Sequence, residues 1–318
     1  MNTSSDTLNC GACGHDCKGG GCVNSQCQPV GVQSLNTGAV ILGLDSTNLY
    51  YTQGSSFSLN AFEIGKNVTG GSGTGIGPTI GLASFVGVVG NTLYWNSTSQ
   101  YSCTISSCTA TTYAYPTFAP FVSWHAASPQ YIPQFSSSAT AATVTWYSSG
   151  SVNPVATSNP GGFDSVTSLM ASSNGVYWLW SGSLYGTNTT MSTGYTFMAT
   201  NLTQNPTIAD VNVRSILLLD NSAGTNLSRV PLPSGLDPHS SPQVLIGASG
   251  AATVVAATED ENYVYWMDVL GNVNRCAATN CSTSQAVIVS GQATSVPALF
   301  QDDAAIYWSG GQIMRLAK

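Results

Sequence analysis

The chain has 318 residues, of which 42% are hydrophobic and only 7% charged, and its formal net charge at pH 7 is -7. Seven Lys and Arg residues are too few to form the basic surface that binds nucleic acid or anionic membranes, so we expect neither partner. The longest apolar runs, such as residues 39–44 and 216–219, fall far below the roughly 20 residues that cross a bilayer, which predicts no membrane span.

The first residues and the composition bear on location. Residues 1–5 have neither the basic nor the apolar region of a signal peptide, so either a signal peptide has been removed or the chain begins at an internal boundary, the second interpretation being favoured. Ser, Thr, Asn and Gly are abundant. With so few charged residues, hydroxyl and amide groups must form most of the surface's hydrogen bonds to water. Such a surface suits a secreted, extracellular or cell-surface protein.

A cysteine-rich head opens the chain. Either a disulfide knot staples a segment too short for a hydrophobic core, or the cysteines and His15 bind a metal. We favour the knot because the second Cys-x2-Cys half of a zinc site is missing. Five is an odd number, so one head cysteine is expected to lack a partner within the chain. The head cysteines are Cys10, Cys13, Cys17, Cys22 and Cys27.

The head has the spacing Cys-Gly-x-Cys-Gly-x-x-Cys, followed by two more cysteines and Gln28-Pro29. It resembles the Cys-rich head that precedes β-propeller repeats in a family of secreted bacterial proteins, most familiar from myxobacteria. The resemblance implies a propeller and secretion, and it implies no catalyst because that family has no established activity. Another cysteine usually precedes the run in that family, and its absence here fits truncation.

From Val30 onward, Val, Ile, Thr and Tyr alternate between clusters of Gly, Asn, Ser and Pro, which predicts an all-β fold. An aromatic pair recurs along this part at separations of 44, 83, 88 and 42 residues, so the long gaps are about twice the short ones. The anchors are Tyr51, Trp95, Trp178, Trp266 and Trp308.

A period of about 43 residues with four strands per repeat is typical of a propeller blade. The spacing predicts seven blades, with the two missing anchors near Phe135 and Leu218. Six blades are the alternative, if the middle repeats form one distorted blade. The last repeat ends after its third strand, so we expect residues 30–37 to supply its fourth strand and close the ring. The predicted domains are a head at 1–29 and a propeller at 30–318.

Two residue types recur at fixed places in the predicted blades. Three of the four arginines, Arg229, Arg275 and Arg315, occupy one position of the third strand, where we expect them to cap loops or span adjacent blades. Two Cys-x4-Cys segments follow third strands and predict local disulfides. These cysteines are Cys103, Cys108, Cys276 and Cys281.

No catalytic motif is visible. The three histidines, His15, His125 and His239, have no metal-ligand spacing, and no nucleophile elbow or zinc-protease helix is present. We therefore assign no catalytic residue. An extracellular polysaccharide lyase or hydrolase with residues converging at the channel mouth remains an alternative, because sequence spacing does not reveal such a site.

Two further groups are candidate sites. The acidic residues Asp260, Glu261, Asp302 and Asp303 occupy equivalent turns and either bind calcium or simply form solvated turns, the second interpretation being favoured. Aromatic residues outside the anchor position cluster in the degenerate third and fourth repeats and suggest a surface that stacks on sugars, although core packing explains them at least as well. This candidate ligand site comprises Trp124, His125, Trp146, Tyr147 and Trp180.

The sequence as a whole predicts a secreted binding or interaction protein whose partner is an extracellular glycan, polymer or protein. Self-assembly through the odd head cysteine is a further alternative.

Overall fold

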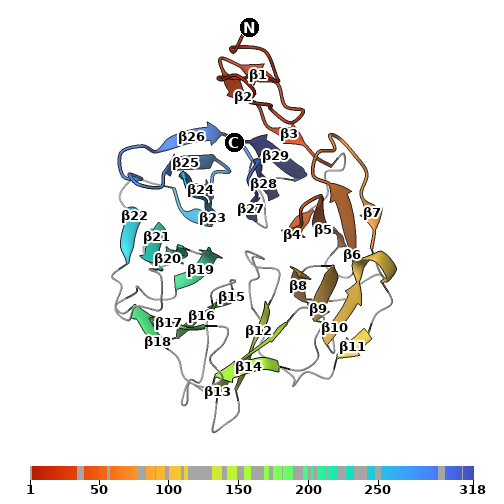
Figure 1. Cartoon of the computed structure of the whole chain (residues 1–318), viewed down its shortest axis with the longest axis vertical. Helices are drawn as coiled ribbons and strands as arrows, with labels where there is room; N and C mark the ends of the chain where they lie inside the picture. The colour runs from red at the N-terminus through yellow and green to blue at the C-terminus, as the bar shows by residue number, and fades with distance from the viewer. Residues whose placement is uncertain are drawn as a thin grey trace.

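The structure is a computed structural model of the chain, and its strands are arranged around a common centre (Figure 1). The described residues are 2–33, 39–55, 58–76, 84–89, 91–96, 100–108, 111–113, 131–137, 142–148, 154–158, 168–171, 175–180, 182–188, 196–199, 202, 206–212, 214–220, 227–232, 242–247, 252–292, 298–309 and 311–318. Within these ranges the fold is all-β, as predicted, and the 3-10 turn η1 (Ile105–Ser107) is the only helical segment. No helix in these ranges is long and apolar enough to span a membrane.

The described strands form a two-stranded hairpin in the head and seven larger antiparallel sheets, six with four strands and one with three. The hairpin joins β1 (Cys22–Val23) and β2 (Gln26–Cys27). Sheet I holds β4 (Val40–Leu44), β5 (Asn48–Ser55), β6 (Ser58–Gly65) and β7 (Thr74–Gly75), and sheet II holds β8 (Ser84–Val89), β9 (Thr92–Asn96), β10 (Gln100–Thr104) and β11 (Thr111–Tyr113). Sheet III holds β12 (Tyr131–Ser137), β13 (Ala142–Ser148) and β14 (Pro154–Ser158), and sheet IV holds β15 (Ser168–Ala171), β16 (Gly175–Trp180), β17 (Ser183–Asn188) and β18 (Thr196–Ala199).

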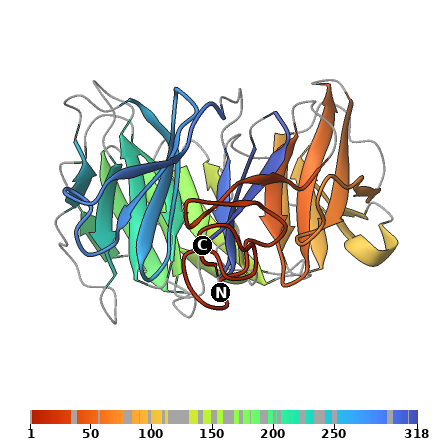
Figure 2. The ribbon, with the colours of Figure 1, turned by 90° about the horizontal axis from the view of Figure 1, so that it is seen from above.

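Sheet V holds β19 (Pro206–Val211), β20 (Ser215–Asp220), β21 (Leu227–Pro231) and β22 (Gln243–Ile246), and sheet VI holds β23 (Val254–Glu259), β24 (Tyr263–Asp268), β25 (Val273–Ala277) and β26 (Ala286–Val289). Sheet VII holds β27 (Leu299–Gln301), β28 (Ala305–Ser309), β29 (Ile313–Ala317) and, from the other end of the chain, β3 (Val30–Gly31). The first strands lie nearest the centre, where β12 contacts β15, β19 contacts β23 and β27 contacts β4 (Figure 1). Seen edge-on in Figure 2, the sheets stand side by side.

Where the aromatic pair recurs, its two residues pack against opposite faces of their sheet, as sheet VI shows. Neighbouring residues of a strand point to opposite faces, so Tyr265 and Trp266 of β24 face different neighbours. Trp266 packs with Leu217 of sheet V, whereas Tyr265 packs with Trp308 of sheet VII. Both residues of the pair are almost fully buried. A sheet covered on both faces needs two adjacent large apolar residues, which explains why the repeat is a dipeptide.

The anchor prediction is right at Leu218 and wrong at Phe135. Leu218 lies on β20, the second strand of sheet V, and is buried. Phe135 lies instead on β12, the innermost strand of sheet III, and the second strand is β13, where Trp146 pairs with Pro133. The spacing from one second strand to the next is therefore not uniform in this part of the chain, and counting in equal periods misplaces the strand.

The seam between sheets VII and I brings both ends of the chain together. Strand β3 pairs with β29, with Val30 opposite Arg315, and Gln33 then forms a parallel bridge with Gly71 of sheet I. Side chains from both sheets share one apolar cluster, in which Tyr51 packs with Tyr307. The paired strand is shorter than the predicted 30–37, of which residues 34–37 lie outside the described ranges.

Candidate functional site

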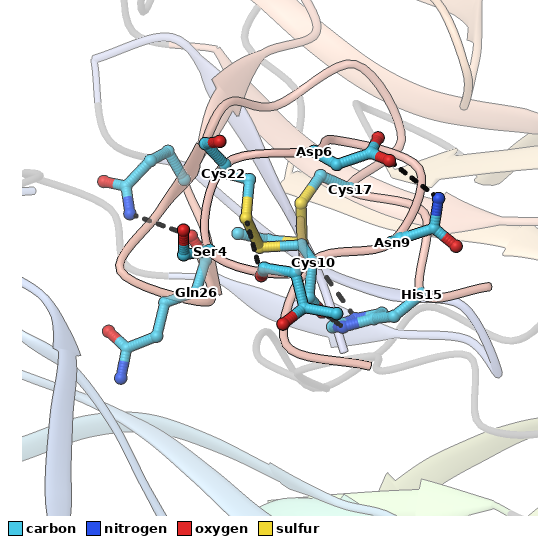
Figure 3. The surroundings of a disulfide bond; sticks show 12 residues. Ser4, Asp6, Asn9, Cys10, His15, Cys17, Cys22 and Gln26 are labelled. Atoms are coloured by element: carbon cyan, nitrogen blue, oxygen red, sulfur yellow. Dashed lines mark hydrogen bonds between the residues drawn. A yellow bond between two sulfur atoms is a disulfide. The ribbon is translucent and has the colours of Figure 1, made fainter. Parts of the chain in front are cut away.

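Two disulfides form the core of the head, joining Cys10 to Cys22 and Cys17 to Cys27 (Figure 3). The sulfur atoms of Cys10, Cys17 and Cys27 lie within 4.8 Å of one another, the only such group of potential metal ligands among the described residues. Because all three are disulfide-bonded, they offer no thiolate to a metal. The fifth head cysteine, Cys13, is exposed.

The head is fastened to the propeller by polar contacts to backbone oxygens. The ring of His15 lies between two carbonyl groups, with Nδ1 2.6 Å from the oxygen of Cys10 and Nε2 against the oxygen of Lys318. Arg315 of β29 is 1% exposed and donates to the carbonyl oxygen of Lys18. Gly19 takes a positive φ of 90° beside this guanidinium, a conformation that glycine adopts without strain. His15 therefore has a structural role.

Both predicted Cys-x4-Cys pairs are disulfides. Cys103 bonds to Cys108 and Cys276 to Cys281, and in each pair the first cysteine lies on a third strand, β10 or β25. The bonds close the turns that lead out of these strands.

Two of the three recurring arginines, Arg229 and Arg315, reach the neighbouring sheet, as the sequence predicted for this position. Arg229 of β21 contacts Glu259 of sheet VI, with its Nε 3.0 Å from Oε2, and donates to the carbonyl oxygen of Ala278 at 2.7 Å. Arg275 instead stays within its own sheet and stacks over Tyr263, 4.8 Å from the ring centroid.

The acidic turn residues serve as turn caps and ion-pair partners. Asp260 Oδ1 accepts the backbone N–H groups of Asn262 and Tyr263, and its Oδ2 lies 2.7 Å from Nζ of Lys318. Asp302 does the same with its own turn, and its Oδ2 lies 2.5 Å from Nζ of Lys66. Burial acts to raise the pKa of both carboxyl groups, but the hydrogen bonds from the lysines and from the turn N–H groups together outweigh it, so both pKa values are lowered.

The other two acids of the calcium hypothesis point elsewhere. Asp303 is exposed, and Glu261 contacts the exposed Arg214 of sheet V. With Asp260 and Asp302 each beside a lysine, the structure does not bring the four carboxylates together as one ligand set. Calcium binding at these turns stays a prediction.

The predicted aromatic ligand site is only partly described. Trp124 and His125 lie outside the described residues, as does His239. Trp146 and Tyr147 are neighbours on β13. Trp180 ends β16, is partly exposed and lies 6.0 Å from the ring centroid of Tyr185.

A cavity of about 300 Å³ opens at the seam, on sheet I. We call it the seam pocket. It is lined by Gln33, Tyr51, Gln53, Asn60, Phe62, Ser72 and Gly73.

Strand register builds one wall of the seam pocket. Tyr51 pairs with Phe62 and Gln53 pairs with Asn60, so these four side chains share one face of sheet I. The rings of Tyr51 and Phe62 stack with centroids 5.4 Å apart. Gly73 passes so close to Tyr51 that a Cβ there would lie 2.2 Å from the tyrosine oxygen. The backbone therefore needs glycine at position 73.

Gln33 supplies the polar group of the pocket that is most deeply buried. Its side chain is 1% exposed, and its Nε2 donates to Oε1 of Gln53 at 2.8 Å. Its Oε1 is buried and has no hydrogen-bond partner among the described residues. A buried acceptor without a donor costs free energy, so a ligand that brings a donor would gain from binding here.

Sequence reasoning missed this pocket. Its residues are scattered over positions 33–73, and apart from the anchor Tyr51 none belongs to a motif. One signal was available in the sequence. Two residues after the anchor Tyr51, on the same face of the strand, stands the polar Gln53, and its partner on the neighbouring strand is the polar Asn60. Trp180 stands at the same distance after the anchor Trp178, so the predicted aromatic site and the seam pocket use equivalent strand positions.

Comparisons with known proteins agree with the fold. No family model and no curated protein sequence matches the chain. The structure of streptogramin B lyase matches with a TM-score of 0.57 and 9% identity over 91% of this chain and 97% of that one. BamB from Moraxella catarrhalis matches with a TM-score of 0.52 and 13% identity, covering 87% of this chain and 85% of that one, and YCF48 bound to D1 peptide with a TM-score of 0.56 and 9% identity, covering 92% and 96%. These are β-propeller proteins, so the chain has a propeller fold, and such low identities carry no further information.

Proposed function

We propose that the protein is a secreted or cell-surface binding protein that recognises glycans or other extracellular polymers. In this proposal seven blades form a closed ring, with residues 30–37 completing the last blade and residues 1–29 forming a separate Cys-rich head. The pairing of β3 with β29 supports the closure, and four disulfides support an oxidising, extracellular location.

One observation carries the binding proposal, namely the seam pocket, whose described lining residues are uncharged and provide an aromatic wall and a buried amide. Carbohydrate sites combine these features, because aromatic rings pack against the C–H face of a sugar and amides bond its hydroxyl groups. In the described part of the chain, His15 is committed to backbone contacts, which leaves no histidine there for acid–base chemistry.

A sedimentation assay with insoluble cellulose, chitin and starch tests this function. We expect wild-type protein to sediment with at least one polysaccharide and to be released by the matching soluble oligosaccharide. Incubation with the same polymers should release no reducing ends and no unsaturated products. Turnover would favour the lyase or hydrolase alternative, and binding only to peptides, as in the YCF48 complex, would contradict glycan recognition.

A further inference from the structure

We propose that the seam pocket binds one uncharged sugar ring in its pyranose form, as a single residue of a neutral oligosaccharide or polysaccharide. This inference rests on the proposed function and adds to it the site, the chemical class of the ligand and the groups that select it.

The first step is the unpaired acceptor. The Nε2 of Gln33 donates a hydrogen bond to Gln53, and this bond sets the orientation of the Gln33 carboxamide before any ligand arrives. The remaining Oε1 needs a donor, and it is too deeply buried for bulk water to satisfy it freely. A sugar hydroxyl is such a donor, and its oxygen can accept a further hydrogen bond at the same time.

The second step is the aromatic wall. Tyr51 is buried behind the pocket, whereas Phe62 is partly exposed and stacks on it at an interplanar angle of 18°. The stacked pair gives Phe62 a fixed orientation, so little conformational entropy is lost when a ligand packs against it. The C–H face of a pyranose suits this surface, and the polar edge of the sugar then meets the amides.

The third step is charge and size. Among the described residues that line the seam pocket none is ionisable near neutral pH, so a uronate or sulfated sugar would lose hydration without gaining a cationic partner from them. The volume of about 300 Å³ is at the lower end of small-molecule sites, which suits one ring rather than a long oligomer. Ser72, one of the lining residues, is exposed, so the rest of a polymer can continue outward into solvent on this side.

Isothermal titration with cellotriose, maltotriose, mannotriose and trigalacturonate tests the proposal on the whole chain. We expect at least one neutral triose to bind and trigalacturonate to bind at least tenfold more weakly. Ser72→Tyr places a bulky side chain at the exposed mouth and should weaken binding by more than tenfold. The matched control Ser282→Tyr, on an exposed turn of sheet VI, should leave the affinity unchanged.

Gln33→Met tests the polar step separately. It keeps the side-chain length and removes the Oε1 acceptor together with the Nε2 donor to Gln53. The lost neutral hydrogen bond to the sugar corresponds to about a five- to tenfold weaker affinity. The melting temperature of each variant reports whether it folds. Wild-type affinity in both Ser72→Tyr and Gln33→Met would overturn the seam site while leaving glycan binding intact, whereas wild-type protein that binds no glycan overturns both. Tighter binding of trigalacturonate would overturn the assignment of a neutral ligand.

Discussion

Arg315 donates a hydrogen bond across the seam to the carbonyl oxygen of Lys66, the residue that follows the third strand of sheet I. Arg229 makes the same kind of contact between sheets V and VI, to Ala278, which follows the third strand of sheet VI. The two arginines occupy equivalent positions on β29 and β21. The contact between sheets VII and I, which lie at opposite ends of the sequence, is thus built like the contact between consecutive sheets.

Arg315→Met should destabilise the protein by about 3 kcal/mol, because the carbonyl groups of Lys66 and Lys18 lose a buried charged donor. Urea unfolding measures the change, and hydrogen exchange in the head should quicken at the same time. Arg214→Met is the matched control, since Arg214 and Glu261 form an exposed ion pair that contributes less than about 0.5 kcal/mol. Equal losses in the two variants would contradict the role given to Arg315.

The buried carboxyl group of Asp210 should make the free energy of unfolding depend on pH. Burial raises its pKa to about 6, and the nearby Glu259, whose own pKa burial also raises, adds to the effect. The folded state therefore keeps a proton that the unfolded state has already released, and this contribution to stability is lost as pH rises from about 4 to about 6. By linkage the loss is about 3 kcal/mol.

The variant Asp210→Asn should show a flatter stability profile over that pH window. Its stability below pH 4 will be lower for another reason, because the amide has one oxygen in place of two: Oδ2 accepts from Thr258 Oγ1 and the Glu259 N–H group, and Oδ1 accepts from the Val211 N–H group. The difference in slope between wild type and variant is therefore the quantity to measure by urea unfolding. Parallel profiles would show that Asp210 does not titrate differently on folding.

Gly73→Ala should destabilise the protein by about 2 kcal/mol because its Cβ would overlap the hydroxyl group of Tyr51. Tyr51→Phe removes that oxygen, so the double variant should recover about 1 kcal/mol of the loss in a double-mutant cycle. Gly75→Ala serves as the control, because its Cβ would meet Phe62 at an ordinary 3.9 Å and should cost little. Strict additivity of the Gly73 and Tyr51 effects would refute the steric explanation.

The disulfide assignment predicts the thiol content. Denatured but unreduced protein should titrate with at most one thiol per chain, because four disulfides use eight of the nine cysteines. Peptide mapping without reduction should recover Cys10 joined to Cys22 and Cys17 to Cys27. Three or more thiols, or a Cys10–Cys17 peptide, would show that the head pairs differently.

Much of the fold could be predicted because the propeller repeats its packing. Trp178 and Trp308 pair with Leu169 and Leu299, the residues that the sequence places nine positions earlier. At Tyr51 and Trp95 the partner shifts by one residue, to Ile41 and Phe85, because a β-bulge follows in each first strand. A bulge leaves no signal in a pattern of hydrophobic residues.

The seam pocket could not be predicted, because it lies where the last sheet in the chain, sheet VII, meets the first, sheet I. Gln33 follows the strand that belongs to sheet VII, while Gln53 and Asn60 belong to sheet I. Only the closure between these sheets brings them together. None of these residue types signals a binding site by itself. The capacity to bind a ligand arises from the side-chain contacts in the folded protein and from the burial of the Gln33 amide.

Hydrogen–deuterium exchange with a bound neutral oligosaccharide tests the central claim most directly, because it finds the site without assuming it. We predict slower exchange in residues 50–62 and 70–76, which contain most of the seam pocket, and no change there in Ser72→Tyr. Protection confined to residues 142–148 and 175–180, around Trp146, Tyr147 and Trp180, would contradict the seam site and favour the aromatic face that the sequence suggested.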